Sequence, residues 1–208
     1  AAESLKADQE FILEIIENIG VPTLLHAAES LKANRQFVIK AVNLNGGALK
    51  YVDEDLKNDR EVVLSAARSE LMMSAALLYA SESLKANSEF VIEVIKSNKY
   101  GVRYAIEFAA ENIKADRKVV LEAIKLEPYP EVLEFAATGL KADREVILTA
   151  VKKNGKNLQY ADENLKNDRE VVLVAIQSND EALEYASENL KADREVVLTA
   201  IKKNSWAL

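Results

Sequence analysis

Side chains able to do chemistry are few in this chain, and they are scattered. The 208 residues include no Cys and a single His, His26, and no HExxH, nucleophile-elbow or glycine-rich phosphate-loop pattern is present. Without Cys the chain forms no disulfide, offers no thiol nucleophile and lacks the commonest zinc ligand. A lone His to which no carboxylate or nucleophile is assigned is weak evidence for a general base. We therefore predict a chain that is not an enzyme and has no catalytic residues, cofactor or metal.

Aromatic, arginine and methionine side chains gather in the middle of the chain, in ELMMSAALLYA, SNKYGVRYA and EPYPE. Tyr, Arg and Met are enriched at protein interfaces, and loops carry function more often than core positions do. An alternative interpretation is that the extra residues lengthen a helix by one turn and pack inward, which we favour for Met72 and Met73. The predicted partner-binding residues are Tyr100, Arg103, Tyr104 and Tyr129.

These candidates lie in a sequence that repeats itself. A Leu-Lys or Ile-Lys step recurs at intervals of 26, 25, 28, 29, 27, 25 and 25 residues. Self-similarity at such a period is typical of solenoids, whose units bury their apolar faces only against their neighbours. The extra residues of the three longer central units fall at one place in the repeat, and insertions in repeat proteins often map to the binding face. The recurring steps are Leu5-Lys6, Leu31-Lys32, Leu56-Lys57, Leu84-Lys85, Ile113-Lys114, Leu140-Lys141, Leu165-Lys166 and Leu190-Lys191.

One unit contains two predicted helices. Asp168 is a suitable N-cap for the apolar run REVVLVAIQSN, and the segment EALEYASENLK (181–191) places Leu183, Ala186 and Leu190 on one stripe. Asn-Gly at 45–46 and 154–155 predicts helix ends in the left-handed conformation. The fold class is therefore all-α, an α-solenoid of about eight short antiparallel helical hairpins.

With the unit written out, the sequence resembles a known repeat family. YADENLKNDREVVL at Tyr160 recurs with two changes as YVDEDLKNDREVVL at Tyr51, and LKADREVILTAVKKN at Leu140 recurs as LKADREVVLTAIKKN at Leu190. This pattern is similar to that of the helical-repeat family named domain of unknown function 4116. The sequence departs from the family pattern at Gln9, which stands in place of Arg, and in the longer central units. It implies a tandem helical array and adds no chemistry.

A basic row is predicted where one helix of the unit meets the next. One interpretation is a ladder for an acidic peptide or another polyanion. The other, which we favour, is that each Lys neutralises the end of the second helix and each Arg pairs with a Glu of its own or the next unit. The row consists of the Lys residue of each recurring step together with Arg35, Arg60, Arg117, Arg144, Arg169 and Arg194.

The bulk charge limits the classes of partner. A net charge of -7 and a pI near 5.0 argue against non-specific binding to nucleic acid or to an anionic membrane surface. The most apolar stretch, LMMSAALLYA, is about half as long as a membrane-spanning helix, and the chain opens with no signal-peptide pattern. We predict a soluble protein, with a cytoplasmic location favoured and the compartment otherwise undetermined.

The ends of the chain read as interrupted repeats. AAESLKA at Ala1 is identical to AAESLKA at Ala27, and the chain stops at SWAL inside a further unit. We therefore predict one repeat domain, residues 1–208, that starts and ends mid-repeat as a fragment of a longer protein. End-to-end self-association through uncapped termini is also predicted.

A binding scaffold for a protein or peptide partner is the function that these features favour. A passive spacer within a larger multidomain protein is the alternative, and an enzyme with an unrecognised site ranks third. His26 stands where other units place Tyr or Phe, so we interpret it as a packing substitute.

Overall fold

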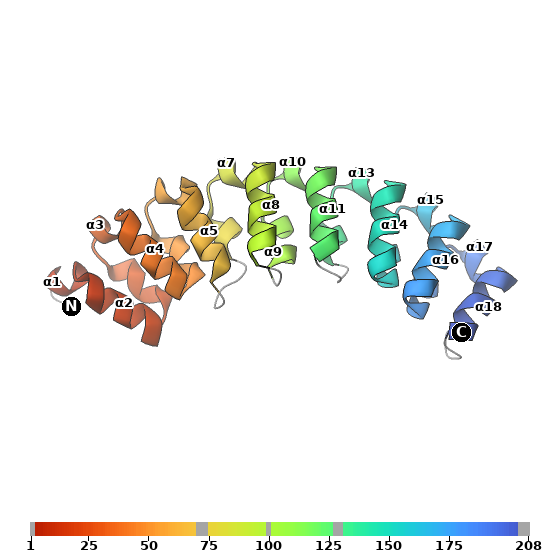
Figure 1. The fold of residues 1–208 in the computed structure, drawn as a ribbon, viewed down its shortest axis with the longest axis horizontal. Helices are drawn as coiled ribbons and strands as arrows, with labels where there is room; N and C mark the ends of the chain where they lie inside the picture. The colour runs from red at the N-terminus through yellow and green to blue at the C-terminus, as the bar shows by residue number, and fades with distance from the viewer. Residues whose placement is uncertain (1–2, 70–74, 99–100, 127–130, 204–208) are drawn as a thin grey trace. The chain divides into compact units, whose positions relative to one another are not determined.

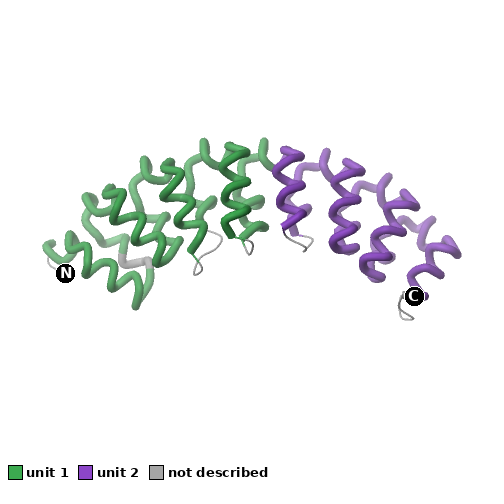
Figure 2. Tube along the Cα trace, in the orientation of Figure 1, with its two compact units in different colours: residues 1–113 green, residues 114–208 purple. Residues whose placement is uncertain are grey.

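The computed structural model describes residues 3–69, 75–98, 101–126 and 131–203. Every regular element in these ranges is a helix, and successive repeats lie side by side within each part of the chain (Figure 1). The chain divides into two compact units, unit 1 with residues 1–113 and unit 2 with residues 114–208 (Figure 2). The predicted all-α repeat solenoid is confirmed.

Each repeat consists of three elements, a long helix, a second element and a short helix. The long helices have nine or ten residues, the second elements five or six, and the short helices three or four. Several second elements are 3-10 helices, which are labelled η. In Figure 1 the short helices lie at one end of the long helices.

In unit 1 the elements are α1 (Glu3–Lys6), α2 (Gln9–Asn18), η1 (Val21–His26), α3 (Glu29–Lys32), α4 (Arg35–Leu44), η2 (Gly46–Tyr51), η3 (Leu56–Asn58), α5 (Arg60–Arg68), α6 (Ala75–Tyr79), α7 (Glu82–Lys85), α8 (Ser88–Ser97) and α9 (Val102–Glu107). The short helix α10 (Glu111–Lys114) includes the last residue of unit 1. In unit 2 they are α11 (Arg117–Leu126), α12 (Glu131–Phe135), α13 (Thr138–Lys141), α14 (Arg144–Lys153), η5 (Gly155–Tyr160), α15 (Glu163–Lys166), α16 (Arg169–Ser178), η6 (Asp180–Tyr185), α17 (Glu188–Lys191) and α18 (Arg194–Lys203).

The long helices begin at the predicted caps. Asp168 precedes α16 in an extended conformation, and its Oδ1 accepts hydrogen bonds from the backbone N–H groups of Glu170 at 2.9 Å and Val171 at 3.1 Å. An Asn cap such as Asn34 accepts one, from Phe37 at 3.0 Å. Each cap satisfies N–H groups that have no partner inside the helix, which is worth about 1 kcal/mol.

The long helices end differently from the prediction. Asn45 and Asn154 are extended, with φ of -155° and -152°, and the one positive φ among the described residues belongs to Gly20. The Asn side chain is the reason. Asn154 Oδ1 accepts from Lys156 N at 3.0 Å and so caps η5, which requires the extended backbone of an N-cap. The same residue thus ends one helix and begins the next, and the left-handed interpretation was wrong.

The predicted second helix is broken in two. Ser187, between η6 and α17, is extended with φ -60° and ψ 155°, and its backbone N–H donates to the carbonyl of Lys166 in the preceding repeat at 3.0 Å. A continuous helix would direct that N–H into its own turn, so the bond between repeats requires the break. Equivalent bonds join Ala28 to Lys6, Asp53 to Lys32, Ser81 to Lys57 and Ala110 to Lys85 in unit 1, and Ala137 to Lys114 and Asp162 to Lys141 in unit 2.

The core runs between successive long helices. In α16, which packs between α14 and α18, Val171 and Ala175 form one buried face and Val172 and Ile176 the other, all with 0% exposure. The i, i+4 spacing places each pair on one side of the helix. An interior long helix is therefore buried on two sides, as its apolar run predicts.

Candidate interaction surface

The described part of the chain contains two of the four predicted binding residues. Tyr100 and Tyr129 lie outside the described residues, as do Met72 and Met73. Arg103 lies in helix α9, and so does Tyr104 beside it. The expected loop is thus a helix at these two positions.

Helix α9 turns an apolar face inward and a mixed face outward. Val102, Ala105 and Ile106 are at most 4% exposed and pack toward α6 and α8. Arg103 and Tyr104 occupy the opposite side and are half-buried. The 3.6-residue period of the helix produces this division, since residues 102, 105 and 106 share one face.

The outer side of α9 carries a cluster of planar groups, here named the α9 cluster and composed of Arg103, Tyr104, Glu107 and Phe108. The rings of Tyr104 and Phe108 are stacked, with centroids 6.4 Å apart and planes inclined by 8°. The Arg103 guanidinium carbon lies 5.6 Å from the centroid of the Tyr104 ring, and its Nε lies 3.9 Å from Glu107 Oε2. Guanidinium and aromatic groups in this arrangement attract one another and hold each other's rotamers.

Phe108 belongs to a set of rings that recurs at one position of the second elements. The second elements of unit 1 contact one another in the order η1, η2, α6, α9, and those of unit 2 in the order α12, η5, η6. Equivalent positions on neighbouring elements therefore lie in a row. All of these rings are half-buried. We call them the ring row, which consists of Tyr51, Tyr79 and Phe108 in unit 1 and of Phe135, Tyr160 and Tyr185 in unit 2.

Cations and leucines flank the ring row. Lys50 Nζ lies 5.3 Å from the Tyr51 ring centroid, and Lys141 Nζ lies 5.9 Å from that of Tyr160. In unit 1, Leu25 is 54% exposed and Leu78 is 40% exposed, each directly before the aromatic position of its repeat. The row thus joins exposed apolar and aromatic groups with lysines, and of these the aromatic residues are enriched at protein interfaces.

His26 occupies the aromatic position of η1 and is exposed. The prediction that it substitutes for a packed ring was therefore wrong. Leu24, two residues earlier, fills the core at 0% exposure, as Leu49 and Leu158 do at the same position of their repeats.

Five arginines of the basic row, Arg35, Arg60, Arg117, Arg144 and Arg169, are paired with the next repeat. Arg144 donates from Nε to Asp168 Oδ2 at 3.1 Å and from Nη2 to Glu170 Oε2 at 2.5 Å. Arg60 is followed by a repeat whose cap is the uncharged Asn87, and it donates instead to Glu93 at 3.1 Å. The same pattern joins Arg35 to Asp59 and Glu61, Arg117 to Asp143 and Glu145, and Arg169 to Asp193 and Glu195.

The lysines of the row are paired as well. Lys32 donates to Glu29 Oε1 at 2.8 Å and to the carbonyl of Leu25, near the end of η1, at 3.0 Å, and its side chain is only 11% exposed. Lys141 likewise reaches the carbonyl of Glu134 at 3.0 Å. Further Lys–Glu pairs at i, i+3 are Lys6–Glu3, Lys57–Glu54, Lys85–Glu82, Lys166–Glu163 and Lys191–Glu188. Most of the row is therefore neutralised internally, which favours the second of the two interpretations.

This pairing lowers the pKa of the capping carboxyl groups. The hydrogen bond from Arg35 lowers the pKa of Asp59, and that from Arg117 lowers the pKa of Asp143. At Asp168 partial burial acts to raise the pKa, but the backbone N–H of Val171 and the Arg144 guanidinium outweigh it. These caps stay ionised well into the acidic range.

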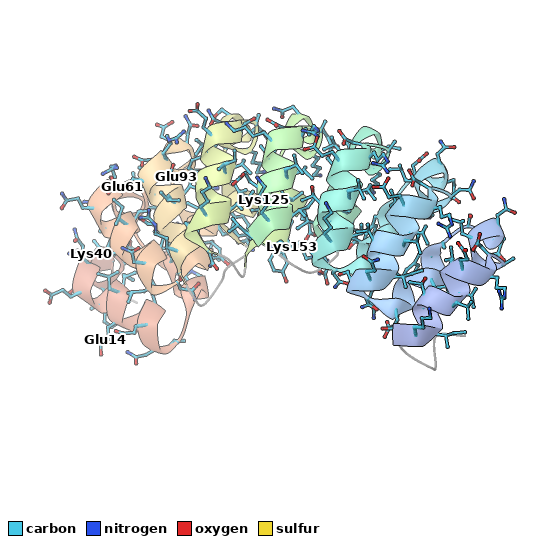
Figure 3. All side chains as sticks on the ribbon, turned by 45° about the vertical axis from the view of Figure 1, so that its right-hand side comes forward. Glu14, Lys40, Glu61, Glu93, Lys125 and Lys153 are labelled. Carbon is cyan, nitrogen blue, oxygen red and sulfur yellow. The ribbon has the colours of Figure 1, made fainter. Side chains whose placement is uncertain are left out.

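The outer side of the long helices has a different composition from the ring row. Figure 3 shows charged side chains on these helices, among them Glu14, Lys40, Glu61 and Glu93 in unit 1, and Lys125 and Lys153 in unit 2. All six are exposed. This face is solvated and of mixed sign, so it offers little apolar area to a partner.

Among the described residues, no three His, Cys, Asp or Glu side chains are grouped in a way that would hold a metal ion. No described helix combines the length and the apolar character that crossing a bilayer requires.

Stacked three-element repeats, joined by backbone hydrogen bonds and by arginine pairs, define the protein as a tandem-repeat α-solenoid. The family model described as Domain of unknown function (DUF4116) matches residues 8–56, 34–85, 87–141, 143–191 and 175–208. The chain belongs to this family, as its resemblance predicts. No curated protein matches the chain. No solved structure matches it either.

The ring row is the feature that sequence reasoning missed. Its signal was present, because an aromatic residue followed by Ala or Val recurs at 51–52, 79–80, 108–109, 135–136, 160–161 and 185–186. Recurrence was interpreted as packing, and only the smaller residue of each pair is in fact buried. Partial exposure of the ring is what distinguishes the row from the core.

Proposed function

We propose that the chain is a non-enzymatic scaffold that binds a protein or peptide partner along the ring row. The observation that carries this proposal is that the rings recur in repeat after repeat and yet stay half-buried. Aromatic side chains bury a large apolar area with few rotatable bonds, and this makes them effective anchors for a partner.

The paired charges support the same surface by contrast. Most arginines and lysines of the basic row are paired with carboxylates inside the array, so a partner that bound them would have to break those pairs. The ring row requires no such exchange. In unit 1 a partner on the ring row would also cover the exposed side chains of Leu25 and Leu78, and removing this apolar area from water is favourable.

The α9 cluster shares Phe108 with the ring row and adds a stacked ring, a guanidinium and a carboxylate beside it. Stacking of Tyr104 on Phe108 and of Arg103 over Tyr104 fixes three planar groups before any partner arrives. A surface ordered in advance loses less conformational entropy on binding. We therefore place the strongest contacts of unit 1 at α9, and Tyr100 and Tyr129 remain predicted contacts.

Selection of a phage-displayed random peptide library on the full chain tests the proposal. The Kd of a selected, fluorescein-labelled peptide is then measured by fluorescence anisotropy. We expect Arg103→Ala with Tyr104→Ala to weaken binding about tenfold or more, because buried Arg and Tyr anchors are each worth about 1–2 kcal/mol or more. A Tyr100→Ala, Tyr129→Ala variant tests the remaining predicted contacts.

The matched control changes Glu14, Lys40 and Lys125 to Ala on the long-helix face, and circular dichroism checks that every variant is folded. Equal weakening by the control, or full binding by the Arg103 and Tyr104 variant, would contradict the assignment of binding to the ring row and the α9 cluster beside it. A library that yields no binder would favour the passive spacer.

A further inference from the structure

Two Asn-Gly steps, Asn45-Gly46 and Asn154-Gly155, lie where a long helix passes into the second element of its repeat. In this dipeptide the main-chain nitrogen of Gly attacks Cγ of the Asn side chain readily, since no Cβ hinders its approach. A bond forms between that nitrogen and Cγ, the Cγ–Nδ2 bond breaks, and Nδ2 leaves as ammonia with the proton of the Gly nitrogen. Water then opens the succinimide ring, and the residue becomes aspartate or isoaspartate.

The folded chain holds Asn154 away from this reaction. Its backbone is extended, with ψ of 117°, and its Oδ1 accepts the N–H of Lys156 at 3.0 Å. Ring closure requires the Gly155 nitrogen to eclipse Cβ of Asn154, whereas at this ψ the nitrogen is turned away from Cβ. The reaction therefore requires the peptide bond between Asn154 and Gly155 to turn and the hydrogen bond from Lys156 to break.

Packing resists that turn. Gly155 is buried, and a Cβ on it would lie 2.2 Å from the carbonyl oxygen of Ala175 and 3.0 Å from the nitrogen of Asn179. Its main chain thus lies directly against the end of α16, and the peptide bond can turn only when η5 moves away. The rate at Asn154 is then the rate of an open chain multiplied by the fraction of molecules in which η5 is open.

Asn45 has the same geometry and one further bond. Its ψ is 112°, and its Oδ1 accepts from the N–H of Gly47 at 3.0 Å. The attacking nitrogen itself, that of Gly46, also donates to Oγ of the buried Ser69 in the next repeat at 3.1 Å. This bond fixes the nitrogen that would have to move, so the reaction at Asn45 requires the contact between two repeats to break as well.

Unit 2 has a serine in the equivalent place, but that serine forms a different bond. Ser178, at the end of α16, donates from Oγ to the carbonyl of Lys152 at 3.4 Å. Within the described residues, the nitrogen of Gly155 therefore has no bond that matches the one from Gly46 to Ser69.

We propose that Asn154 is a site of spontaneous deamidation, reached through the release of η5 from α16, and that Asn45 is the slower of the two sites. The difference between them is the bond from Gly46 to Ser69. This modification requires no partner and is independent of the proposed function.

The two products at Asn154 have different consequences. Aspartate is as good an N-cap as asparagine, so it keeps the start of η5, and Lys153 and Lys156 on either side favour its charge. Isoaspartate adds a methylene group to the main chain where Gly155 has no room to shift, so η5 no longer docks on α16. Because η5 ends at Tyr160, this second product also displaces one ring of the ring row.

Peptide mapping of the folded full chain tests the proposal. The chain is incubated at neutral pH for increasing times, digested with a protease that cleaves after Glu, and analysed by mass spectrometry with electron-transfer fragmentation to separate isoaspartate from aspartate. Synthetic peptides of residues 41–50 and 150–159 give the rates without the fold. We expect Asn154 to react about tenfold or more slowly in the chain than in its peptide, and Asn45 several-fold more slowly again.

Two serine variants test the bond to Gly46. Ser69→Ala should raise the rate at Asn45 to about that at Asn154 and leave Asn154 unchanged. The control Ser65→Ala removes another buried hydroxyl from the same repeat and should leave both rates unchanged. Circular dichroism checks that the variants remain folded during the incubation. Asn154→Asp, which represents the aspartate product, should melt at the temperature of the original chain.

Several outcomes would overturn the proposal. If Asn154 reacted in the chain as fast as in its peptide, the opening of η5 would not control the rate. If it did not react at all after its peptide had reacted fully, it would not be a site. An unchanged rate at Asn45 in Ser69→Ala, or an equal rise in Ser65→Ala, would show that the bond to Gly46 does not set the difference.

Discussion

The arginine pairs and the ring row are both periodic, yet they treat their side chains in opposite ways. Arg144, Asp168 and Glu170 meet across two repeats with short donor–acceptor distances. The rings of Tyr160 and Tyr185, in the same unit, remain half-buried. Periodicity alone therefore does not show what a residue is for. What distinguishes the two sets is whether the side chain finds its bonding or packing partners inside the array.

Comparing two phenylalanines gives the largest expected effect. Phe90 is 0% exposed in the stack of long helices, and Phe108 is half-buried in the ring row. We expect Phe90→Ala to lower the free energy of unfolding by about 3–5 kcal/mol through the lost contacts and the cavity, and Phe108→Ala by about 1 kcal/mol. Urea unfolding followed by circular dichroism measures both. Equal losses would remove the distinction between stack and row.

Two glycines sharpen the comparison within unit 2. A Cβ on Gly155, at the start of η5, would lie 2.2 Å from the carbonyl oxygen of Ala175, whereas a Cβ on Gly139 in α13 would meet nothing within 4 Å. We expect Gly155→Ala to destabilise by about 1–3 kcal/mol through overpacking. Gly139→Ala should instead stabilise by about 0.4–1 kcal/mol, because it restricts the unfolded chain. Thermal unfolding should show a lower melting temperature for Gly155→Ala and a higher one for Gly139→Ala. A Gly155→Ala variant as stable as the original chain would show that η5 is packed less tightly than its burial indicates.

The smallest expected effect is the pH dependence of the arginine pairs. The pKa values of Asp59, Asp143 and Asp168 are lowered in the folded chain, so their contribution to stability is present above the ordinary Asp pKa of about 4. It is lost as the pH falls through the lowered values. Changing all three to Asn keeps an N-cap and removes the titration, so the urea midpoint should fall less steeply below about pH 4.

The control for that measurement changes Glu14, Glu17 and Glu184 to Gln, since these carboxylates are exposed and cap no long helix. The control should follow the original chain. An unchanged acid slope in the triple Asn variant would show that the pairs contribute nothing measurable, as many exposed ion pairs do.

Features set within one repeat were predictable from the sequence. The Asp caps are local, because Asp168 bonds to N–H groups two and three residues away. The long helices follow from their apolar runs, and the repeat period itself indicates the stacking of units. Pairing of Arg with the next repeat was one of two open interpretations, and the distances distinguish them.

Features set between repeats were not predictable. The break at Ser187 depends on a carbonyl acceptor in another repeat, Lys166, and the stripe of Leu183, Ala186 and Leu190 fits an unbroken helix equally well. Asn154 has a residue type that suits both a left-handed helix end and an extended cap. Asn154 takes the extended backbone because η5 begins at the very next residue, Gly155.

Only part of the candidate surface could be predicted. Arg103 and Tyr104 remain predicted contacts, and their helical setting was not predicted, because SNKYGVRYA contains a Gly and follows a helix end. The ring row could be recognised only from the exposed fraction of each ring, which the residue type does not determine for Tyr and Phe.

The bond between repeats uses main-chain atoms, the N–H before each short helix and the carbonyl of the preceding Lys. Ser, Asp and Ala all occur at the donor position, so the side chain there is not what makes the join. A duplicated unit therefore brings its own acceptor and its own donor and needs no compensating substitution to be spliced into the array. Such a join permits growth by recombination of whole units, while the side chains on the outer surface are left to diverge.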